Sequence, residues 1–339
     1  MRTLGWWLTV ALATGCGHDD KPSAPPADAE SPPAEPTEDE PGAEPPAKAP
    51  GLAAKVDDAI GRAKASTSTM LIPSGVTLMI GVDIPAFIAK PYWRTIKDKL
   101  SSRPRRQLEA AERCEVGPDK WRAFVIGVEP VSQDMAMVVE AVGIGRHETL
   151  KCLQKEFGNF TLSEDGKEMS DATGGGIVLD DDRIAFATPA LMQPLRDRIA
   201  NEGQPAADGA MEAVLAKTDL KQPLWFSAII PPTQAAMAAA LLGGWPSDVT
   251  GELDLSEGVA LHGRLSTTDP HAAKTKLEAQ WRSIAPAVRA QGIPDAVVDS
   301  VAFSAGDGVL RFDAAIADAD VADALAKTGA PPSAGPVPF

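Results

Sequence analysis

Residues 224–230 of this 339-residue chain, Leu-Trp-Phe-Ser-Ala-Ile-Ile, form a short apolar run that follows Pro223. A run of this length, rich in aromatic and β-branched side chains, predicts a β-strand. A second such run, Val-Thr-Leu-Met-Ile-Gly-Val-Asp, occupies residues 76–83. Behind each run the pattern predicts a helix, a hairpin, a helix, a second hairpin and a closing helix. The chain therefore reads as two similar units.

Hydrophobic periodicity and turn residues give the expected elements. In the first unit they are a strand at 76–83, helices at 85–100 and 104–114, strands at 121–129 and 135–142, a helix at 147–157, strands at 176–179 and 184–187, and a helix at 189–200. After a linking helix at 210–216, the second unit has a strand at 224–230, a helix at 233–242, strands at 249–255 and 259–266, a helix at 269–290, strands at 297–304 and 309–315, and a helix at 318–328. The order β-α-β-β-α-β-β-α predicts an α+β fold with antiparallel sheets and helices packed on one face. Its first six elements follow the order of ferredoxin-like units.

Composition divides the chain further. We expect a signal peptide at 1–15, a lipidated cysteine and disordered tether at 16–50, the two units at 51–205 and 206–328, and a flexible tail at 329–339. A short helix is expected at 52–65, at the start of the first unit. Residues 17–50 contain ten prolines, nine acidic residues and two lysines, with no apolar side chain larger than alanine. Such a segment cannot bury enough apolar surface to fold. At ~3.1 Å per residue it reaches roughly 100 Å.

The first sixteen residues resemble a bacterial lipoprotein signal peptide. Arg2 precedes a short apolar run, and Leu12-Ala-Thr-Gly-Cys16 resembles a lipobox. The run has about half the ~20 residues that a membrane-spanning helix needs. The resemblance implies that Cys16 becomes the acylated first residue of the mature protein and anchors it in a lipid bilayer. Gly17 follows in place of the aspartate that retains lipoproteins in the inner membrane, which favours the outer membrane, on its periplasmic face or at the cell surface. An ordinary secretory signal is the alternative.

With Cys16 acylated, Cys114 and Cys152 remain. An even number of cysteines in an oxidising compartment predicts a disulfide between them. Two buried free thiols are the alternative. No CxxC or HxxxH spacing accompanies them, which argues against zinc. The net charge of −15 leaves no basic footprint for nucleic acid beyond the short Arg103-Pro-Arg-Arg106 cluster, which is typical of a solvated turn.

Residues 70–328 resemble uncharacterised lipoproteins of myxobacterial type. The matching features are Gly81-Val-Asp-Ile-Pro85, Tyr92-Trp93, Cys114 ahead of Gly117-Pro-Asp119, Cys152, and Pro223-Leu-Trp-Phe226. The resemblance implies the disulfide and the fold, and it implies no activity.

The sequence contains no complete catalytic or cofactor motif. His147-Glu148 resembles the start of HExxH, but Lys151 stands where the second histidine is required. Gly143-Ile-Gly145 lacks the third glycine of a dinucleotide loop, because Glu148 stands at that position. Gly174-Gly-Gly176 lacks the lysine of a P-loop, and Asp180-Asp-Asp182 lacks the spacing of a calcium loop and is typical of a hairpin turn. We therefore expect no cofactor, no bound metal and no enzyme activity.

Tryptophans are the remaining candidates. Trp93, Trp121, Trp225 and Trp281 fall on predicted apolar faces and are expected in the core. Trp245 differs, because it follows an alanine-rich helix and lies in a Gly-Gly-Trp-Pro loop, where it could contact a partner or a membrane surface. The sequence favours a non-enzymatic interaction or structural module of the envelope with an unknown partner. The alternative is a carrier for a lipid or another hydrophobic ligand, with the same helix and Trp245 lining its opening.

Overall fold

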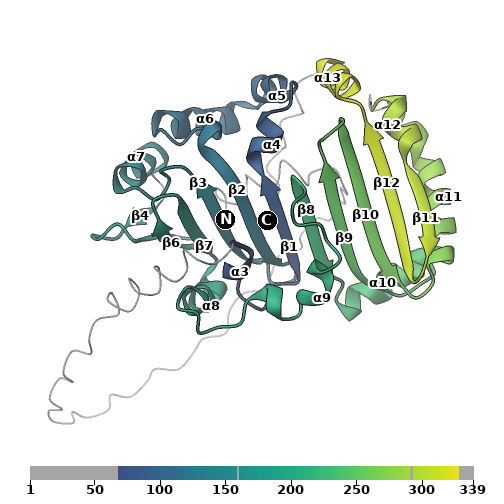
Figure 1. The fold of residues 1–339 in the computed structure, drawn as a ribbon, viewed down its shortest axis with the longest axis horizontal. Coiled ribbons are helices and arrows are strands. Elements are labelled where there is room, and N and C mark those ends of the chain that lie inside the picture. Colours follow the sequence, from purple (N-terminus) through teal and green to yellow (C-terminus); the bar gives the residue numbers. More distant parts are fainter. Residues whose placement is uncertain (1–67, 159, 291–292, 328–339) are drawn as a thin grey trace, which may run out of the picture. The chain divides into compact units, whose positions relative to one another are not determined.

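The computed structural model describes residues 68–158, 160–290 and 293–327. The predicted signal peptide, Cys16, the tether, the helix at 52–65 and the tail from residue 329 lie outside these residues. The described residues form one sheet of twelve strands in the order β11-β12-β10-β9-β8-β1-β2-β3-β7-β6-β5-β4 (Figure 1). Every neighbouring pair is antiparallel.

The strands fall into two groups along the chain. The first group is β1 (Leu78–Asp83), β2 (Trp121–Glu129), β3 (Asp134–Ala141), β4 (Thr161–Leu162), β5 (Glu168–Asp171), β6 (Gly174–Asp180) and β7 (Arg183–Ala187). The second group is β8 (Leu224–Ile229), β9 (Pro246–Asp254), β10 (Val259–Thr267), β11 (Ala302–Gly306) and β12 (Val309–Ile316).

The helices alternate with these strands. The first half contains α3 (Ser68–Leu71), α4 (Ile84–Ile88), α5 (Trp93–Lys99), α6 (Ser102–Arg113), the 3-10 helix η1 (Pro118–Lys120), α7 (His147–Phe157) and α8 (Pro189–Ile199). The linking segment contains η2 (Ala206–Asp208) and α9 (Glu212–Leu215). The second half contains α10 (Pro232–Leu242), α11 (Pro270–Ala290), α12 (Asp295–Ser300) and α13 (Asp318–Lys327).

The two halves of the sheet have the same internal order. From the centre outward, the first half runs β1-β2-β3-β7-β6 and the second runs β8-β9-β10-β12-β11. At the centre β1 and β8 pair with each other, with Ile80 opposite Phe226 and Gly81 opposite Trp225. The predicted α+β class with two similar antiparallel units is confirmed. The two expected sheets are one continuous sheet because their opening strands pair across the centre.

The strand pairing within each half is simpler than the ferredoxin-like comparison implies. β1 pairs with β2 and β2 pairs with β3, although helices separate β1 from β2 in the sequence. A split βαβ unit would instead bring parallel strands together. All the described strand pairs are antiparallel. In each half the first three strands follow one another in the sheet, and the last hairpin is added in reverse order, so that β3 pairs with β7 and β10 pairs with β12.

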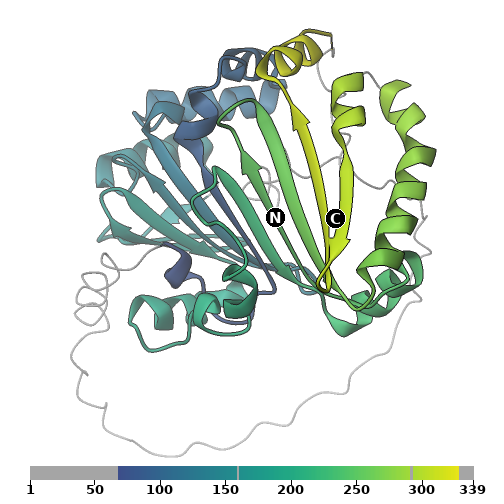
Figure 2. The ribbon, with the colours of Figure 1, turned by 45° about the vertical axis from the view of Figure 1, so that its right-hand side comes forward.

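In the first half of the sheet, helices pack on both faces. Ile177 and Val178 are adjacent in β6, so their side chains point to opposite faces. Ile177 belongs to the main core together with Leu195 of α8, whereas Val178 packs in a second cluster with Leu150 of α7. Because β6 is apolar on both faces, each face is covered by a helix. Figure 2 shows α11 lying alongside the outermost strands of the second half.

Two predicted elements differ from the structure, and one hairpin in the structure was not predicted. The helix expected at 85–100 is divided into α4 and α5, because Pro91 lies between them and cannot continue a helix. The strand expected at 297–304 begins as α12, which follows Pro294 and has Asp295 in its first turn. The polar stretch 160–171 contains β4 and β5, which the sequence did not suggest because they are short and flanked by polar turns.

Aromatic rings occupy the space above mid-strand glycines. A Cβ atom on Gly251 would lie 2.1 Å from Cε1 of Phe226, its cross-strand neighbour. A Cβ atom on Gly263 would lie 1.8 Å from Cζ of Phe312, again its cross-strand neighbour. Each glycine therefore provides the room that its partner's ring requires.

The predicted disulfide is confirmed. Cys114 lies at the C-terminal end of α6 and Cys152 lies within α7, and their sulfur atoms are 2.02 Å apart. The bridge joins two helices that are otherwise separated in the chain by β2 and β3.

Candidate interaction surface

The loops that resembled cofactor motifs have structural roles. A Cβ atom on Gly145 would lie 1.9 Å from the carbonyl oxygen of Asp180, so this glycine allows two loops to approach closely. The backbone N–H of Gly143 donates to Oδ1 of Asp182 at 2.8 Å. Asp180 accepts a hydrogen bond from the N–H of Asp182 and forms an ion pair with Arg183. These carboxylates serve the hairpin turn and the neighbouring loop.

Within the described ranges, no group of three or more His, Cys, Asp and Glu side chains is placed to hold a metal ion. His147 is exposed at the start of α7.

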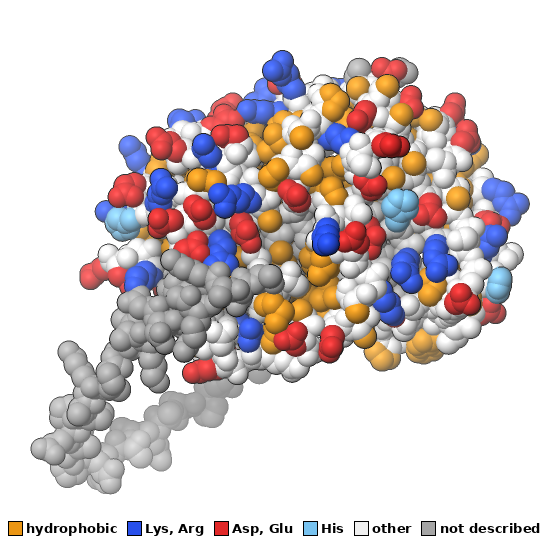
Figure 3. Space-filling view, viewed as in Figure 1, with side chains coloured by type: hydrophobic (Ala, Val, Ile, Leu, Met, Phe, Trp, Pro, Cys, Tyr) orange, Lys and Arg blue, Asp and Glu red, His pale blue; other side chains and the backbone are white. Residues whose placement is uncertain are grey.

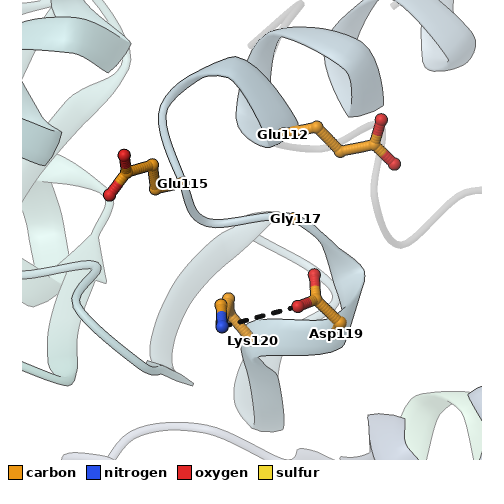
Figure 4. Close-up of a pocket in the computed structure, with 5 residues that line it drawn as sticks. All are labelled: Glu112, Glu115, Gly117, Asp119 and Lys120. Atoms are coloured by element: carbon orange, nitrogen blue, oxygen red, sulfur yellow. Dashed lines mark ion pairs between the residues drawn. The ribbon is translucent and has the colours of Figure 1, made fainter.

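One surface hollow of about 330 Å³ lies beside the end of α6 (Figure 4). Its lining comprises Glu112, Glu115, Gly117, Asp119 and Lys120. Figure 4 shows Glu112 and Glu115 pointing to opposite sides, and Lys120 paired with Asp119 at 3.6 Å. The acidic side chains do not converge on one point, so the hollow provides no common binding position.

A second hollow of about 300 Å³ lies between α11 and α12. Its apolar wall includes Trp281 and Val298, and the indole N–H of Trp281 donates to the carbonyl oxygen of Val298 at 3.3 Å. Arg289 and Asp299 share the wall and pair with each other at 2.5 Å. A hydrophobic ligand in this hollow would have to desolvate these charges, which is unfavourable.

Helix α10 lies inside a long uncharged stretch. Residues 222–247 contain no Asp, Glu, Lys, Arg or His. Pro232 begins the helix, where its missing N–H costs no intrahelical hydrogen bond. Gly243 ends it in the left-handed conformation at φ 80°, which favours glycine. Ala235 is the buried residue of α10, and the rest of the helix is partly or fully exposed.

The exposed face of α10 is apolar. Met237 and Leu241 are one helical turn apart, with 68% and 75% of their surfaces exposed, and Ala236 and Ala240 lie beside them. Trp245 lies in the loop after the helix, beyond Gly243 and Gly244, with 47% of its surface exposed. We call these five residues the α10 surface.

The α10 surface concentrates exposed apolar side chains that are elsewhere scattered. The other large apolar residues exposed in the described parts of the chain are Val131, Leu220, Ile284 and Ile293. Three of the seven therefore fall within nine consecutive positions. Figure 3 shows a small group of hydrophobic side chains at the lower right edge of the molecule, near where Figure 1 places α10, and a larger group along the middle of the same face.

Backbone contacts hold this surface in place. The N–H of Trp245 donates to Oγ1 of Thr268 at 2.8 Å, and the N–H of Thr268 donates to the carbonyl oxygen of Trp245 at 3.1 Å. Nζ of Lys276, on α11, donates to the carbonyl oxygen of Ala240 at 3.2 Å. The loop and the end of the helix are therefore fixed, while the side chains of Leu241 and Trp245 remain exposed.

A buried carboxylate anchors the strand that follows. Burial raises the pKa of Asp248, but hydrogen bonds from Lys217, Ser247 and Ser266 outweigh it and hold the pKa below its ordinary value. Nζ of Lys217 lies 2.9 Å from Oδ1 of Asp248, and Oγ of Ser266 lies 2.8 Å from the same atom. The α10 surface itself contains no ionisable side chain, so its charge does not change with pH.

The tryptophans singled out from the sequence differ in burial. Trp225 is buried in the main core, and Trp93, Trp121 and Trp281 are half-buried. Trp245 is exposed, as its loop position suggested. The sequence did not single out Met237 or Leu241. The available signal was the absence of charge across residues 222–247 in a chain that is 23% charged.

Among the helices of the described residues, none is long and apolar enough to cross a membrane.

No protein-family model matches the chain, and no curated protein matches it. The fold is similar to two solved structures titled "Structure of crystal form I of TP0453" and "Structure of crystal form III of TP0453". The first is 10% identical, with a TM-score of 0.48, covering 77% of this chain and 98% of that chain. The second is 9% identical, with a TM-score of 0.48, covering 78% of this chain and 100% of that chain.

Proposed function

We propose that this protein is a lipid-anchored module of the bacterial cell envelope that acts by contact rather than by catalysis. The observation that carries the proposal is the α10 surface, where Met237, Leu241 and Trp245 are exposed within an uncharged stretch. Concentrated apolar surface on a soluble domain is costly in water and marks interaction sites. The backbone of this surface is fixed by Thr268 and Lys276, so little ordering is needed before contact.

The anchor part of the proposal rests on Cys16 and its lipobox. Acyl chains on Cys16 would hold the protein at a bilayer, and Gly17 after the cysteine favours the outer membrane as that bilayer. The tether at 17–50 would let the folded part sit anywhere from the bilayer surface to roughly 100 Å away. The likeness to uncharacterised myxobacterial-type lipoproteins supports the same setting and adds no activity.

The alternative of a carrier for a hydrophobic ligand needs an apolar cavity of several hundred cubic ångströms. The two hollows described above are of that size, but charged side chains line the first and share the wall of the second. Neither hollow supports the carrier.

Acylation of Cys16 is tested by metabolic labelling. We expect the wild-type chain to incorporate labelled palmitate, and Cys16→Ser to incorporate none and to retain its leader. Wild-type protein cleaved elsewhere and free of palmitate would refute the lipid anchor.

Contact through α10 is tested by photocrosslinking in cells. A photoreactive residue is introduced at Leu241 in one strain and at Val131, an exposed apolar position in the β2–β3 turn, in another. We expect adducts to lipid or to a discrete protein from position 241 and none from position 131. Equal adducts, or none at either position, would refute the contact role.

A further inference from the structure

We infer that the partner of the α10 surface is the interfacial region of a lipid bilayer, where acyl chains meet head groups. This inference rests on the proposed function and names the partner of that same surface. The surface consists of Ala236, Met237, Ala240, Leu241 and Trp245, as defined above.

The chemistry of the surface matches a bilayer interface. No charged side chain occurs between residues 222 and 247, so no ion has to be desolvated when this surface enters the head-group region. Met237 and Leu241 place two large apolar side chains on the exposed face of α10, where they can enter the boundary between head groups and acyl chains. Trp245 adds an indole, which prefers the interface because its ring is apolar and its N–H is polar.

The size of the surface argues against a stable protein partner. Three large side chains and two alanines cover a few hundred square ångströms. A stable interface between two proteins, including two copies of this chain, needs about 800 Å² from each partner. A shallow insertion into lipid has no such minimum, because each buried methylene contributes roughly 0.8 kcal/mol independently of the others.

A cation lies beside the surface. Lys276 is exposed, and its Nζ lies 3.2 Å from the carbonyl oxygen of Ala240. The ammonium group can therefore face lipid phosphate while Leu241, one residue further along, enters the acyl region.

The test uses the mature chain from residue 17, exported with a cleavable leader so that it carries no lipid. It is mixed with vesicles of phosphatidylethanolamine and phosphatidylglycerol and separated by flotation. We expect the wild-type chain to float with the vesicles. The partition coefficient of the triple variant Met237→Ser, Leu241→Ser, Trp245→Ser onto the vesicles should be lower than that of wild type by about tenfold or more. The matched control Val131→Ser, which removes an equally exposed apolar side chain elsewhere, should float like wild type.

Circular dichroism and the urea midpoint establish that each variant is folded. The inference is overturned if the wild-type chain stays with the unbound protein, or if the folded triple variant floats as well as wild type. It is also overturned if sedimentation shows a wild-type dimer that the triple variant loses, because the partner is then a second copy. If crosslinking in cells gives protein adducts from position 241 but the purified chain does not bind vesicles, the proposed contact function stands and the inference of a bilayer partner is refuted. If there are no adducts from position 241 and no vesicle binding, both the proposed contact function and the bilayer inference are refuted.

Discussion

At the scale of single residues, the sheet depends on glycines that leave room for aromatic rings. The ring of Phe312 occupies the position that a side chain on Gly263 would need, and Phe226 does the same over Gly251. On the opposite face, the indole of Trp225 lies 2.2 Å from the Cβ position of Gly81, at the seam between the halves. A glycine in mid-strand weakens a strand by itself, so the packed ring is the compensating interaction.

Gly263→Ala tests this packing. The added methyl group would meet Phe312, and the ring would have to leave its position, so we expect the free energy of unfolding to fall by about 1–3 kcal/mol. Urea denaturation of the mature chain measures the change. Gly306→Ala in the edge strand β11 is the control, because its Cβ position has no atom within 4 Å. Equal effects of the two substitutions would contradict the packing argument.

Asp248 makes stability depend on pH. Its folded-state pKa is lowered, so the carboxylate contributes stability above its unfolded pKa, and this contribution is lost as the pH falls through the folded pKa. The loss is expected below the ordinary value of 3.8. Lys217→Met removes one hydrogen-bond donor and should reduce the free energy of unfolding at neutral pH by roughly 1–2 kcal/mol.

Urea denaturation at about pH 7 and about pH 3 measures this effect. The variant should lose less stability on acidification than wild type, because ionised Asp248 makes one hydrogen bond fewer in the variant and its protonation therefore costs less stability. Lys274→Met removes an exposed ion pair with Glu278 and should change stability by less than about 0.5 kcal/mol at both pH values. A Lys217→Met chain as stable as wild type at neutral pH would show that the buried carboxylate does not need this donor.

At the scale of elements, long periodic segments were predictable from the sequence and short ones were not. The helix at 147–157 and the strand at 121–129 have the predicted bounds, because periodicity and turn residues agree there. The β4–β5 hairpin is too short to show a period. Val297 and Val298 have high strand propensity, yet the preceding Pro294 and Asp295 place them in α12. Local start signals outweighed intrinsic preference at that position.

The disulfide joins two of these elements. Cys114 and Cys152 are 38 residues apart, so the chain-entropy model gives a contribution of about 4 kcal/mol. The double substitution Cys114→Ala, Cys152→Ala should lower the urea midpoint, and reductant should lower that of wild type but not that of the variant. A wild-type midpoint that is insensitive to reductant, with the bridge shown to be open by mass, would refute its stabilising role.

At the scale of the whole molecule, the two similar units share one sheet. The β1–β8 pairing is central, and α13 contacts α5 (Figure 1). Lys90, in the connection between α4 and α5, pairs with Asp318 at the start of α13 at 3.1 Å. The repeated order of elements was predictable from hydrophobic patterns. The joining of the sheets was not, because the pairing of two apolar strands 140 or more residues apart leaves no local trace in either strand.

A shared sheet predicts cooperative unfolding. We expect tryptophan fluorescence and far-ultraviolet circular dichroism of the mature chain to report one coincident urea transition. A fragment ending at residue 205 would expose the edge of β1 and should associate or remain unfolded. Two separate transitions, or a soluble monomeric fragment with native-like spectra, would show that the halves are independent domains.

The candidate site was partly visible in the sequence. Trp245 was identifiable because it lies in a glycine-rich loop after an alanine-rich helix. Met237 and Leu241 were not, because an apolar residue in a helix is more often buried, and exposure depends on which face packs against α11 and β9. Only the three-dimensional structure shows which face of this apolar helix remains exposed.

The most direct measurement is labelling of α10 in the intact envelope. Leu241→Cys and Val131→Cys are expressed in the full acylated chain, and membranes are treated with a hydrophilic maleimide before and after detergent. The account predicts that position 241 is protected until detergent is added, whereas position 131 reacts throughout. Rapid labelling of both positions before detergent would show that the α10 surface is uncovered in its native setting and would contradict its role as the contact surface.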